Sequence, residues 1–141
     1  MKAYIKLEGD VTAEDSFYFK ELANLIKTEC DLSVKVEETK LEPGVKDGGL
    51  ATGLNIASLT LTGIQTLFST LQYWESRQGN GELRPNYSVL VIVYTRTYRE
   101  THLLKNLSAE KVIELLEIIY QHRLQPSLED EYIEFQITRL R

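Results

Sequence analysis

The chain is short of the residues on which most catalytic and metal-binding motifs depend. Its 141 residues include one cysteine, Cys30, and two histidines, His102 and His122. A single cysteine excludes an intrachain disulfide, and together with a first segment that lacks the apolar core of a secretory signal it indicates a cytoplasmic protein. Neither histidine stands in a Cys-x-x-Cys or His-x-x-x-His arrangement, so the sequence predicts no metal site. Cys30 ends an apolar helical stripe, which favours packing over nucleophilic chemistry. We therefore expect no catalytic residues, no cofactor and no enzymatic activity.

Positive charge is also scarce. The chain has 16 Lys and Arg residues against 21 Asp and Glu residues, which gives a net charge of −5. A nucleic-acid-binding protein needs a basic surface that displaces counterions from phosphates, so we expect no nucleic-acid partner. The basic residues gather only at 96–99 and 139–141. Arg96 and Arg99 suit a hairpin tip that docks on an acidic partner protein.

Charge of either sign is absent from residues 48–74, a run of 27 residues. A run of this length raises the question of a membrane span. Thr, Ser, Asn and Gln interrupt it every few positions, which instead favours an amphipathic helix. The sequence predicts one long uncharged helix over 48–77, capped by Asp47, whose apolar residues recur at spacings of four and three. That apolar stripe is Leu50, Leu54, Ala57, Leu61, Ile64, Phe68 and Leu71.

The reverse of this predicted helix is a candidate contact surface. A solvent-exposed helix face usually carries Lys and Glu, whereas this face carries hydroxyl and amide groups. We expect a partner protein, or a second copy of the chain, to cover it, with Trp74 as an aromatic anchor. The candidate interface residues are Thr52, Asn55, Thr62, Thr66, Ser69, Trp74, Arg96 and Arg99.

Two loops resemble ligand sites only in part. Gly48 and Gly49 precede the predicted helix, but a phosphate-binding loop needs a Gly-Lys-Ser/Thr triplet, and Asp47 repels phosphate. The acidic run 129–131 comes before the last predicted strand, where a solvated turn is the ordinary interpretation.

The remainder of the chain alternates between strand and helix patterns. Apolar residues recur at every second position over 3–7, 32–36 and 132–140, while 87–95 is apolar on both faces and 100–104 is a short return strand. Capped apolar stripes predict further helices over 12–30 and 108–120. We expect a single α+β domain over residues 1–141. It should hold one mixed or antiparallel sheet of about five strands in the order β-α-β-α-β-β-α-β, with three helices, one of them long and uncharged.

Four features follow each other along residues 1–121, beginning with a short N-terminal strand that leads into a helix. A Pro-Gly loop, Leu41-Glu42-Pro43-Gly44, leads into the small residues Asp47-Gly48-Gly49-Leu50-Ala51. The predicted long helix ends in Leu71-Gln72-Tyr73-Trp74-Glu75-Ser76-Arg77. A hairpin, Tyr87 to Leu104, and a capped helix, Ser108 to Tyr120, follow. Together these features resemble the first type of the effector-associated constant component family of prokaryotic conflict systems. The stretch Leu61-Thr62-Gly63-Ile64 departs from the more glycine-rich pattern of the family, and 122–141 forms a C-terminal strand extension beyond the resemblance.

The resemblance implies a non-enzymatic adaptor or regulatory component of an antiviral defence or other conflict system. Such a component couples sensing to an effector, for example a protease or a nucleotide-dependent regulator, through protein–protein contacts. The family carries no catalytic residues, so none is transferred to this chain. Two alternatives stay open at this point. One is a membrane-acting effector whose helix over 48–77 inserts into lipid on activation, and the other is a small-molecule-binding sensor domain.

Overall fold

Strands and helices follow each other along the chain in the order β-α-β-β-α-β-β-α-β. The computed structural model describes residues 2–39, 50–77, 85–95, 98–123 and 132–140. Within them it has three helices and a mixed sheet of six strands, so the α+β class is confirmed and the expected strand number is too low by one. The elements are β1 (Lys2–Leu7), α1 (Ala13–Glu29), β2 (Lys35–Thr39), β3 (Leu50–Ile56), α2 (Leu61–Ser76), β4 (Tyr87–Thr95), β5 (Tyr98–Leu103), the short 3-10 helix η1 (Leu104–Asn106), α3 (Ala109–Arg123) and β6 (Tyr132–Arg139).

The first and last strands lie side by side in the middle of the sheet. The strand order is β2-β3-β1-β6-β4-β5. β1 pairs in parallel with β6, where Ile5 lies opposite Phe135, and the other neighbours are all antiparallel. This central parallel pair joins the hairpin-like half β2–β3 to the half β4–β5.

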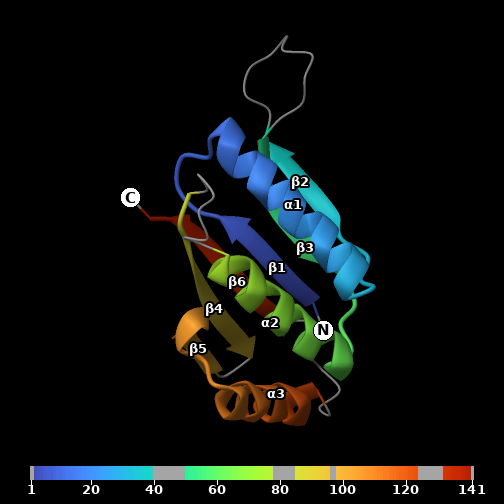
Figure 1. Cartoon of the computed structure of the whole chain (residues 1–141). Helices are drawn as coiled ribbons and strands as arrows, with labels where there is room; N and C mark the ends of the chain where they lie inside the picture. Colours follow the sequence, from blue (N-terminus) through green and yellow to red (C-terminus); the bar gives the residue numbers. More distant parts are fainter. Residues whose placement is uncertain (1, 40–49, 78–84, 96–97, 124–131, 141) are drawn as a thin grey trace.

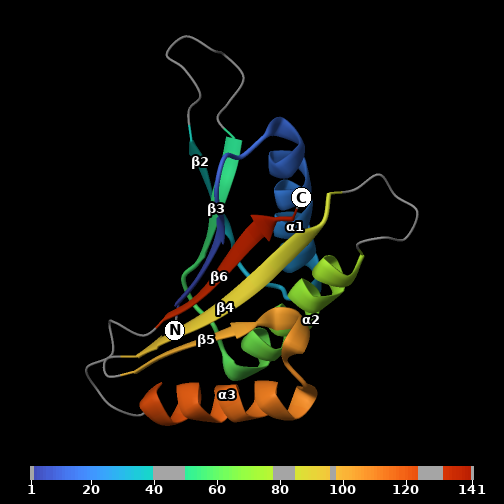
Figure 2. The ribbon, with the colours of Figure 1, turned by 90° about the vertical axis from the view of Figure 1, so that its left-hand side faces the viewer.

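The helices α1, α2 and α3 cover one face of this sheet (Figures 1 and 2). Alternate strand residues point toward them and are almost fully buried, as the strand period of two requires. Phe68 of α2 meets Phe135 of β6 edge to face, with ring centroids 5.5 Å apart. The core beneath the helices includes Ile5, Leu54, Val91, Ile133, Phe135, Phe19, Leu22, Leu67, Leu71 and Leu115. The described part of the chain places no helix on the opposite face.

The long helix expected over 48–77 is wrong in its first part. Residues 50–56 form β3, and α2 begins only at Leu61, where the Thr60 hydroxyl accepts a hydrogen bond from the Gly63 N–H at 3.0 Å. Leu54 and Ile56 point to the helices as alternate residues of a strand, and both neighbours, β1 and β2, supply it with hydrogen bonds. Two ladders satisfy the backbone over 50–56 at least as well as a helix would. No helix in the described residues has the length and apolar character to cross a membrane.

Other expected boundaries are closer to the structure. Thr12 caps α1 in a capping box with Asp15, as the sequence predicts, and the Ser108 hydroxyl accepts a hydrogen bond from the Lys111 N–H at the start of α3. The strand expected over 32–36 lies three residues further on, at 35–39. The short return strand is longer at its start and is β5, 98–103.

Candidate functional site

The outer surface of α2 is a stripe of uncharged polar side chains. Thr62, Thr66, Ser69 and Tyr73 follow each other at spacings of four and three, so they share one side of the helix. The Thr66 hydroxyl donates to the Thr62 carbonyl at 3.0 Å, which fixes its rotamer along the helix. Thr62, Ser69 and Tyr73 are exposed, and Thr66 is half-buried.

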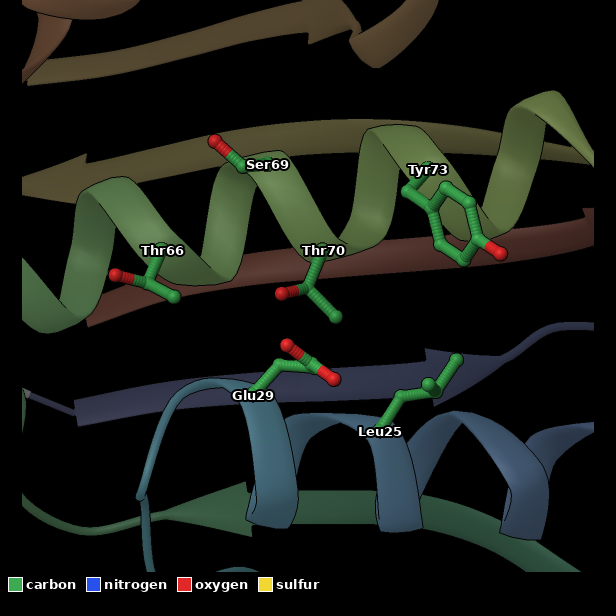
Figure 3. A pocket seen from close by; sticks show the side chains of 6 residues that line it. All are labelled: Leu25, Glu29, Thr66, Ser69, Thr70 and Tyr73. Carbon is green, nitrogen blue, oxygen red and sulfur yellow. The ribbon is translucent and has the colours of Figure 1, made fainter.

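A groove separates this stripe from α1. We call it the α1–α2 groove, a hollow of about 440 Å³ (Figure 3) lined by Leu25, Glu29, Thr66, Ser69, Thr70 and Tyr73. Figure 3 shows Thr66, Thr70 and Tyr73 of α2 on one side, opposite Leu25 and Glu29 of α1, while the Ser69 hydroxyl points away from α1. The groove therefore combines four hydroxyl groups, one apolar side chain and one carboxylate.

The thiol of Cys30 stands beside the Thr70 wall of the groove. Its Sγ lies 3.3 Å from the Thr70 Oγ1. Burial raises the pKa of the Cys30 thiol, the Thr70 hydrogen bond acts in the opposite direction, and the nearby Glu29 carboxylate raises it further. Cys30 is therefore protonated at neutral pH and is a poor nucleophile.

Charged groups link α1 to the C-terminal end of α2. The Arg77 guanidinium forms an ion pair with the Glu21 carboxylate of α1. The same guanidinium lies 6.0 Å from the centre of the Tyr73 ring. This part-exposed pair adds one contact between α1 and the C-terminal end of α2.

The described residues place no helix over the other face of the sheet, which we call the open face and which carries a group of aromatic and charged side chains. Three tyrosines from three neighbouring strands line up across it. The ring of Tyr132 lies 5.4 Å from that of Tyr4, edge to face, and 4.5 Å from that of Tyr94, stacked. The guanidinium of Arg99 lies 5.3 Å from the Tyr94 ring centre on the side of β5.

A carboxylate is buried beside these rings. Glu134 is 7% exposed, and its oxygens lie 3.3 Å from the Tyr94 hydroxyl, 3.4 Å from the Gln136 amide nitrogen and 3.5 Å from the Lys6 ammonium. Burial, followed by the charge of Glu134, raises the pKa of Tyr94. Tyr94 is therefore a neutral hydrogen-bond donor to Glu134 at physiological pH.

The residues that were expected to form one interface lie at several separate places in the structure. Thr62, Thr66 and Ser69 lie together on α2. Asn55 belongs to β3 and Arg99 to β5, and both are on the open face, where Asn55 donates to Glu37. Thr52 lies at the irregularity in the β2–β3 pairing, between Gly53 and Ala51.

The expected anchor Trp74 is instead a core residue. It is 0% exposed and stacks on the Tyr87 ring at 5.2 Å, so it offers no surface to a partner in the folded chain. Its position in the helix explains this burial, because Trp74 follows Leu67 and Leu71 on the sheet-facing side of α2. Arg96, the glycine pair at 48–49 and the acidic run 129–131 lie outside the described residues.

The sequence interpretation missed both the second wall of the groove and the tyrosines of the open face. Leu25 and Glu29 give no signal of their own, because only tertiary packing brings α1 beside α2. Tyr4 and Tyr132 do give a signal in the sequence, because they occupy outward positions of strongly alternating strands. In the part of the chain that the structure describes, no three His, Cys, Asp or Glu residues gather as a metal site would require.

No protein family, no curated protein and no solved structure matches this chain.

Proposed function

We propose that this chain is a non-enzymatic adaptor or regulatory component that couples sensing to an effector of a prokaryotic conflict system through protein–protein contacts. The observation that carries the proposal is the hydroxyl-lined α1–α2 groove, in which Glu29 is the one charged side chain among the six lining residues. The sequence features shared with the effector-associated constant component family give the proposal its biological setting.

The energetics of desolvation favour contact at this groove. Hydroxyl groups lose far less free energy than ammonium or carboxylate groups when a partner excludes water from them. The exposed Ser69 hydroxyl can donate or accept, whereas the Thr66 hydroxyl donates to the Thr62 carbonyl and keeps its acceptor lone pairs for a partner. Tyr73 is 57% exposed and adds a large ring with a polar tip, a side chain that often dominates binding energy.

The groove also selects the chemistry of its partner. Leu25 gives its α1 wall an apolar contact, and Glu29 gives that wall a negative charge. We therefore propose as occupant a segment of the effector that presents an apolar side chain and a Lys or Arg. The basic residue would meet Glu29, which keeps the specificity of the contact while most of the interface stays uncharged.

A double substitution tests the proposal. Thr62→Lys with Thr66→Lys places two ammonium groups along the α2 stripe, at one exposed and one half-buried position. We expect the thermal melt to stay close to that of the wild type and the effector response in cells to be lost. The matched control is Ile113→Lys, at an exposed position of α3, a helix that contributes no residue to the lining of the groove. Loss of the fold in the double variant, or an equal loss of response in the control, would contradict the proposal.

The volume of the groove also favours a second candidate function, a small-molecule sensor. About 440 Å³ lies within the range of small-ligand sites, and the hydroxyl groups would suit a polyol or an amine held by Glu29. Melting-temperature shifts with a panel of polyols and polyamines separate the two candidates. A shift that Glu29→Gln removes supports the sensor, and its absence throughout the panel favours the adaptor.

A further inference from the structure

The outer edge of β5 has no partner strand among the described residues. β5 is the last strand in the sheet order, so it pairs with β4 alone. In an antiparallel pair the N–H and C=O of one residue point to the same neighbour, and successive residues point to opposite sides. Half of the six residues of β5 therefore turn their backbone groups away from the sheet.

Hydrogen bonds at the start of β4 show which side each of its residues faces. The Asn86 C=O accepts from the Leu140 N–H at 2.7 Å, so the even-numbered residues of this segment point to β6. The odd-numbered residues then point toward β5. The Val89 N–H agrees with this, because it lies just beyond the paired part of β5 and donates at 2.8 Å to the Glu75 carboxylate instead.

The β4–β5 register carries this assignment over to β5. Val91 pairs with His102 and Val93 with Glu100, so the backbone groups of His102 and Glu100 are bonded to β4. The intervening residues point outward, and all of them are exposed. These outward residues are Arg99, Thr101 and Leu103. Their N–H and C=O groups form a regular edge that another strand can extend.

The two edges of the sheet differ in how well they are protected against strand addition. The pairing of β2 shifts between Glu37 and Glu38, and such an irregularity disrupts a strand edge. β5 pairs with β4 over all six of its residues without a shift. The Glu100 carboxylate faces the helices, but the Lys111 ammonium lies 3.6 Å from it, so Glu100 is not the unpaired inward charge that protects some edges.

The position of α3 favours a single strand over a second copy of the sheet as occupant of this edge. α3 packs against α2 and β4, and Figure 2 shows it on the far side of β5 from β4, running alongside the strand. Two copies joined edge to edge around a two-fold axis would both place α3 beside the joint, where the two helices compete for the same space. A lone extended segment brings no helix layer with it.

Side chains along the edge define what this segment carries. Leu103 is a large apolar residue that is 37% exposed, and the Arg99 guanidinium contacts the Tyr94 ring and forms no ion pair with a described carboxylate. Residues directly opposite each other on antiparallel strands are in contact. An apolar residue opposite Leu103 and a carboxylate opposite Arg99 therefore complement the edge. An acidic partner is also what the sequence predicts for this arginine.

We propose that β5 binds an extended segment of a partner protein as a seventh, antiparallel strand of the sheet. Along the segment, an apolar residue opposite Leu103 comes four positions before an Asp or Glu opposite Arg99. Backbone hydrogen bonds supply the affinity, and these two side chains supply the specificity. The α1–α2 groove is lined by residues of other elements, so strand addition does not depend on the function proposed for the groove.

A synthetic peptide with this pattern, Thr-Val-Thr-Thr-Val-Glu-Thr, tests strand addition to the full chain. Its second residue should lie opposite Leu103 and its sixth opposite Arg99. Amide hydrogen exchange followed by NMR should show a Thr101 N–H that is unprotected in the free chain and protected at about 1 mM peptide, with the His102 N–H protected throughout. A Thr101 N–H that exchanges equally fast with and without the peptide overturns the proposal.

Two methylated peptides distinguish strand addition from binding elsewhere on the chain. N-methylation of the fourth residue, opposite Thr101, removes a donor that points to β5 and should weaken binding at least about tenfold. N-methylation of the third residue, whose N–H points away from β5, should leave the affinity unchanged. Equal effects of the two methyl groups overturn the proposal, and this comparison needs no substitution in the protein.

Substitutions in the chain test the side-chain pattern. Arg99→Glu should weaken binding of the peptide by about threefold or more, and it should favour the same peptide with Lys in place of Glu. The matched control is Lys2→Glu, which makes the same change of charge on β1, separated from β5 by β6 and β4. A control that acts like Arg99→Glu overturns the proposal. A wild-type dimer in sedimentation that Thr101→Pro dissociates would assign the edge to a second copy and overturn it as well.

Discussion

Removing the hydroxyl of Tyr87 should measurably destabilise the fold, because it ends a buried hydrogen bond to a carboxylate. Tyr87 is 2% exposed and donates to the Asp15 Oδ1 at 2.7 Å, and Asp15 is 4% exposed. Asp15 also accepts from the Thr12 N–H at 3.1 Å and lies 3.3 Å from the Arg139 guanidinium. The cluster therefore ties the start of α1 to β4 and to the end of β6.

Tyr87→Phe keeps the ring that stacks on Trp74 and removes only the oxygen. Hydrogen bonds to charged groups contribute about 1.5–3 kcal/mol, so we expect the free energy of unfolding at pH 7 to fall by about 2 kcal/mol. The midpoint of thermal unfolding should fall by roughly 6 °C, given about 3 °C per kcal/mol for a chain of this size.

The effect should depend on pH in a defined direction. Burial alone would raise the pKa of Asp15, but the hydrogen bonds from Tyr87 and Thr12 and the charge of Arg139 lower it below its ordinary value of 3.8. An acid with a lowered folded pKa contributes stability above its unfolded pKa and loses that contribution as the pH falls through the folded value. The difference between the wild type and Tyr87→Phe should therefore be largest at pH 7 and shrink below pH 3.8.

Urea unfolding followed by circular dichroism at several pH values measures these differences. Tyr94→Phe is the matched control, because Tyr94 also donates to a carboxylate, at 3.3 Å, but is only half-buried. It should cost less than about 1 kcal/mol. Equal losses for the two variants at pH 7, or a Tyr87→Phe effect that stays constant down to pH 3, would refute the role given to the Asp15 cluster.

Two further substitutions test buried groups outside that cluster. Glu75 is 8% exposed and accepts a hydrogen bond from the Val89 N–H at 2.8 Å. Burial raises the pKa of Glu75 in spite of this bond. Its charged form therefore destabilises the fold as the pH rises through the folded pKa. Glu75→Gln keeps an acceptor for the Val89 N–H. It should raise the free energy of unfolding at pH 8 by up to about 1 kcal/mol and should give no gain at pH 4. Urea titrations measure both values, and a lower free energy of unfolding at pH 8 would contradict the prediction. The raised pKa of Cys30 predicts that iodoacetamide alkylates the native chain several-fold more slowly at pH 7.5 than it alkylates the urea-unfolded chain, as mass spectrometry of the product would show. Thr70→Ala should change the native rate. Equal native and unfolded rates would contradict the raised pKa of this part-buried thiol.

The sequence alone predicted the strands and helices that are marked by patterns of neighbouring residues. Alternation over 3–7 and 132–140 identified β1 and β6, and the run 87–95, apolar on both faces, identified β4. The capping residues Thr12 and Ser108 marked the starts of α1 and α3. These signals depend on neighbours within a few residues of the chain, so one sequence suffices to find them. The α+β class followed from the same elements.

β3 could not be found in this way, because its apolar residues fit two periods at once. Leu50, Leu54 and Ala57 continue the helical spacing of α2, while Leu54 and Ile56 also alternate as strand residues do. The decision depends on hydrogen bonds to β1 and β2, which are distant in sequence. Long-range pairing of this kind is what overrides local periodicity.

Only the α2 wall of the candidate site could be predicted from the sequence. The helical spacing of Thr62, Thr66 and Ser69 is a local property, so the sequence indicated an uncharged stripe on α2. The wall formed by Leu25 and Glu29 arises from the packing of α1 against α2, which no local pattern encodes. Trp74 was expected to be an exposed anchor for a partner. Its position on the sheet-facing side of α2 makes it a core residue instead.

The most direct test of the central proposal is a titration of the purified chain, measured by calorimetry, with the protease or nucleotide-dependent regulator that the proposal expects to find encoded beside its gene. The proposal predicts that the wild type binds, that Ser69→Lys weakens binding at least about tenfold, and that Ile113→Lys binds like the wild type. Glu29→Gln should lower the affinity by a smaller factor that decreases with added salt. Binding that is absent in the wild type, or unchanged by a lysine at Ser69, would contradict the assignment of the α1–α2 groove as the effector-binding surface.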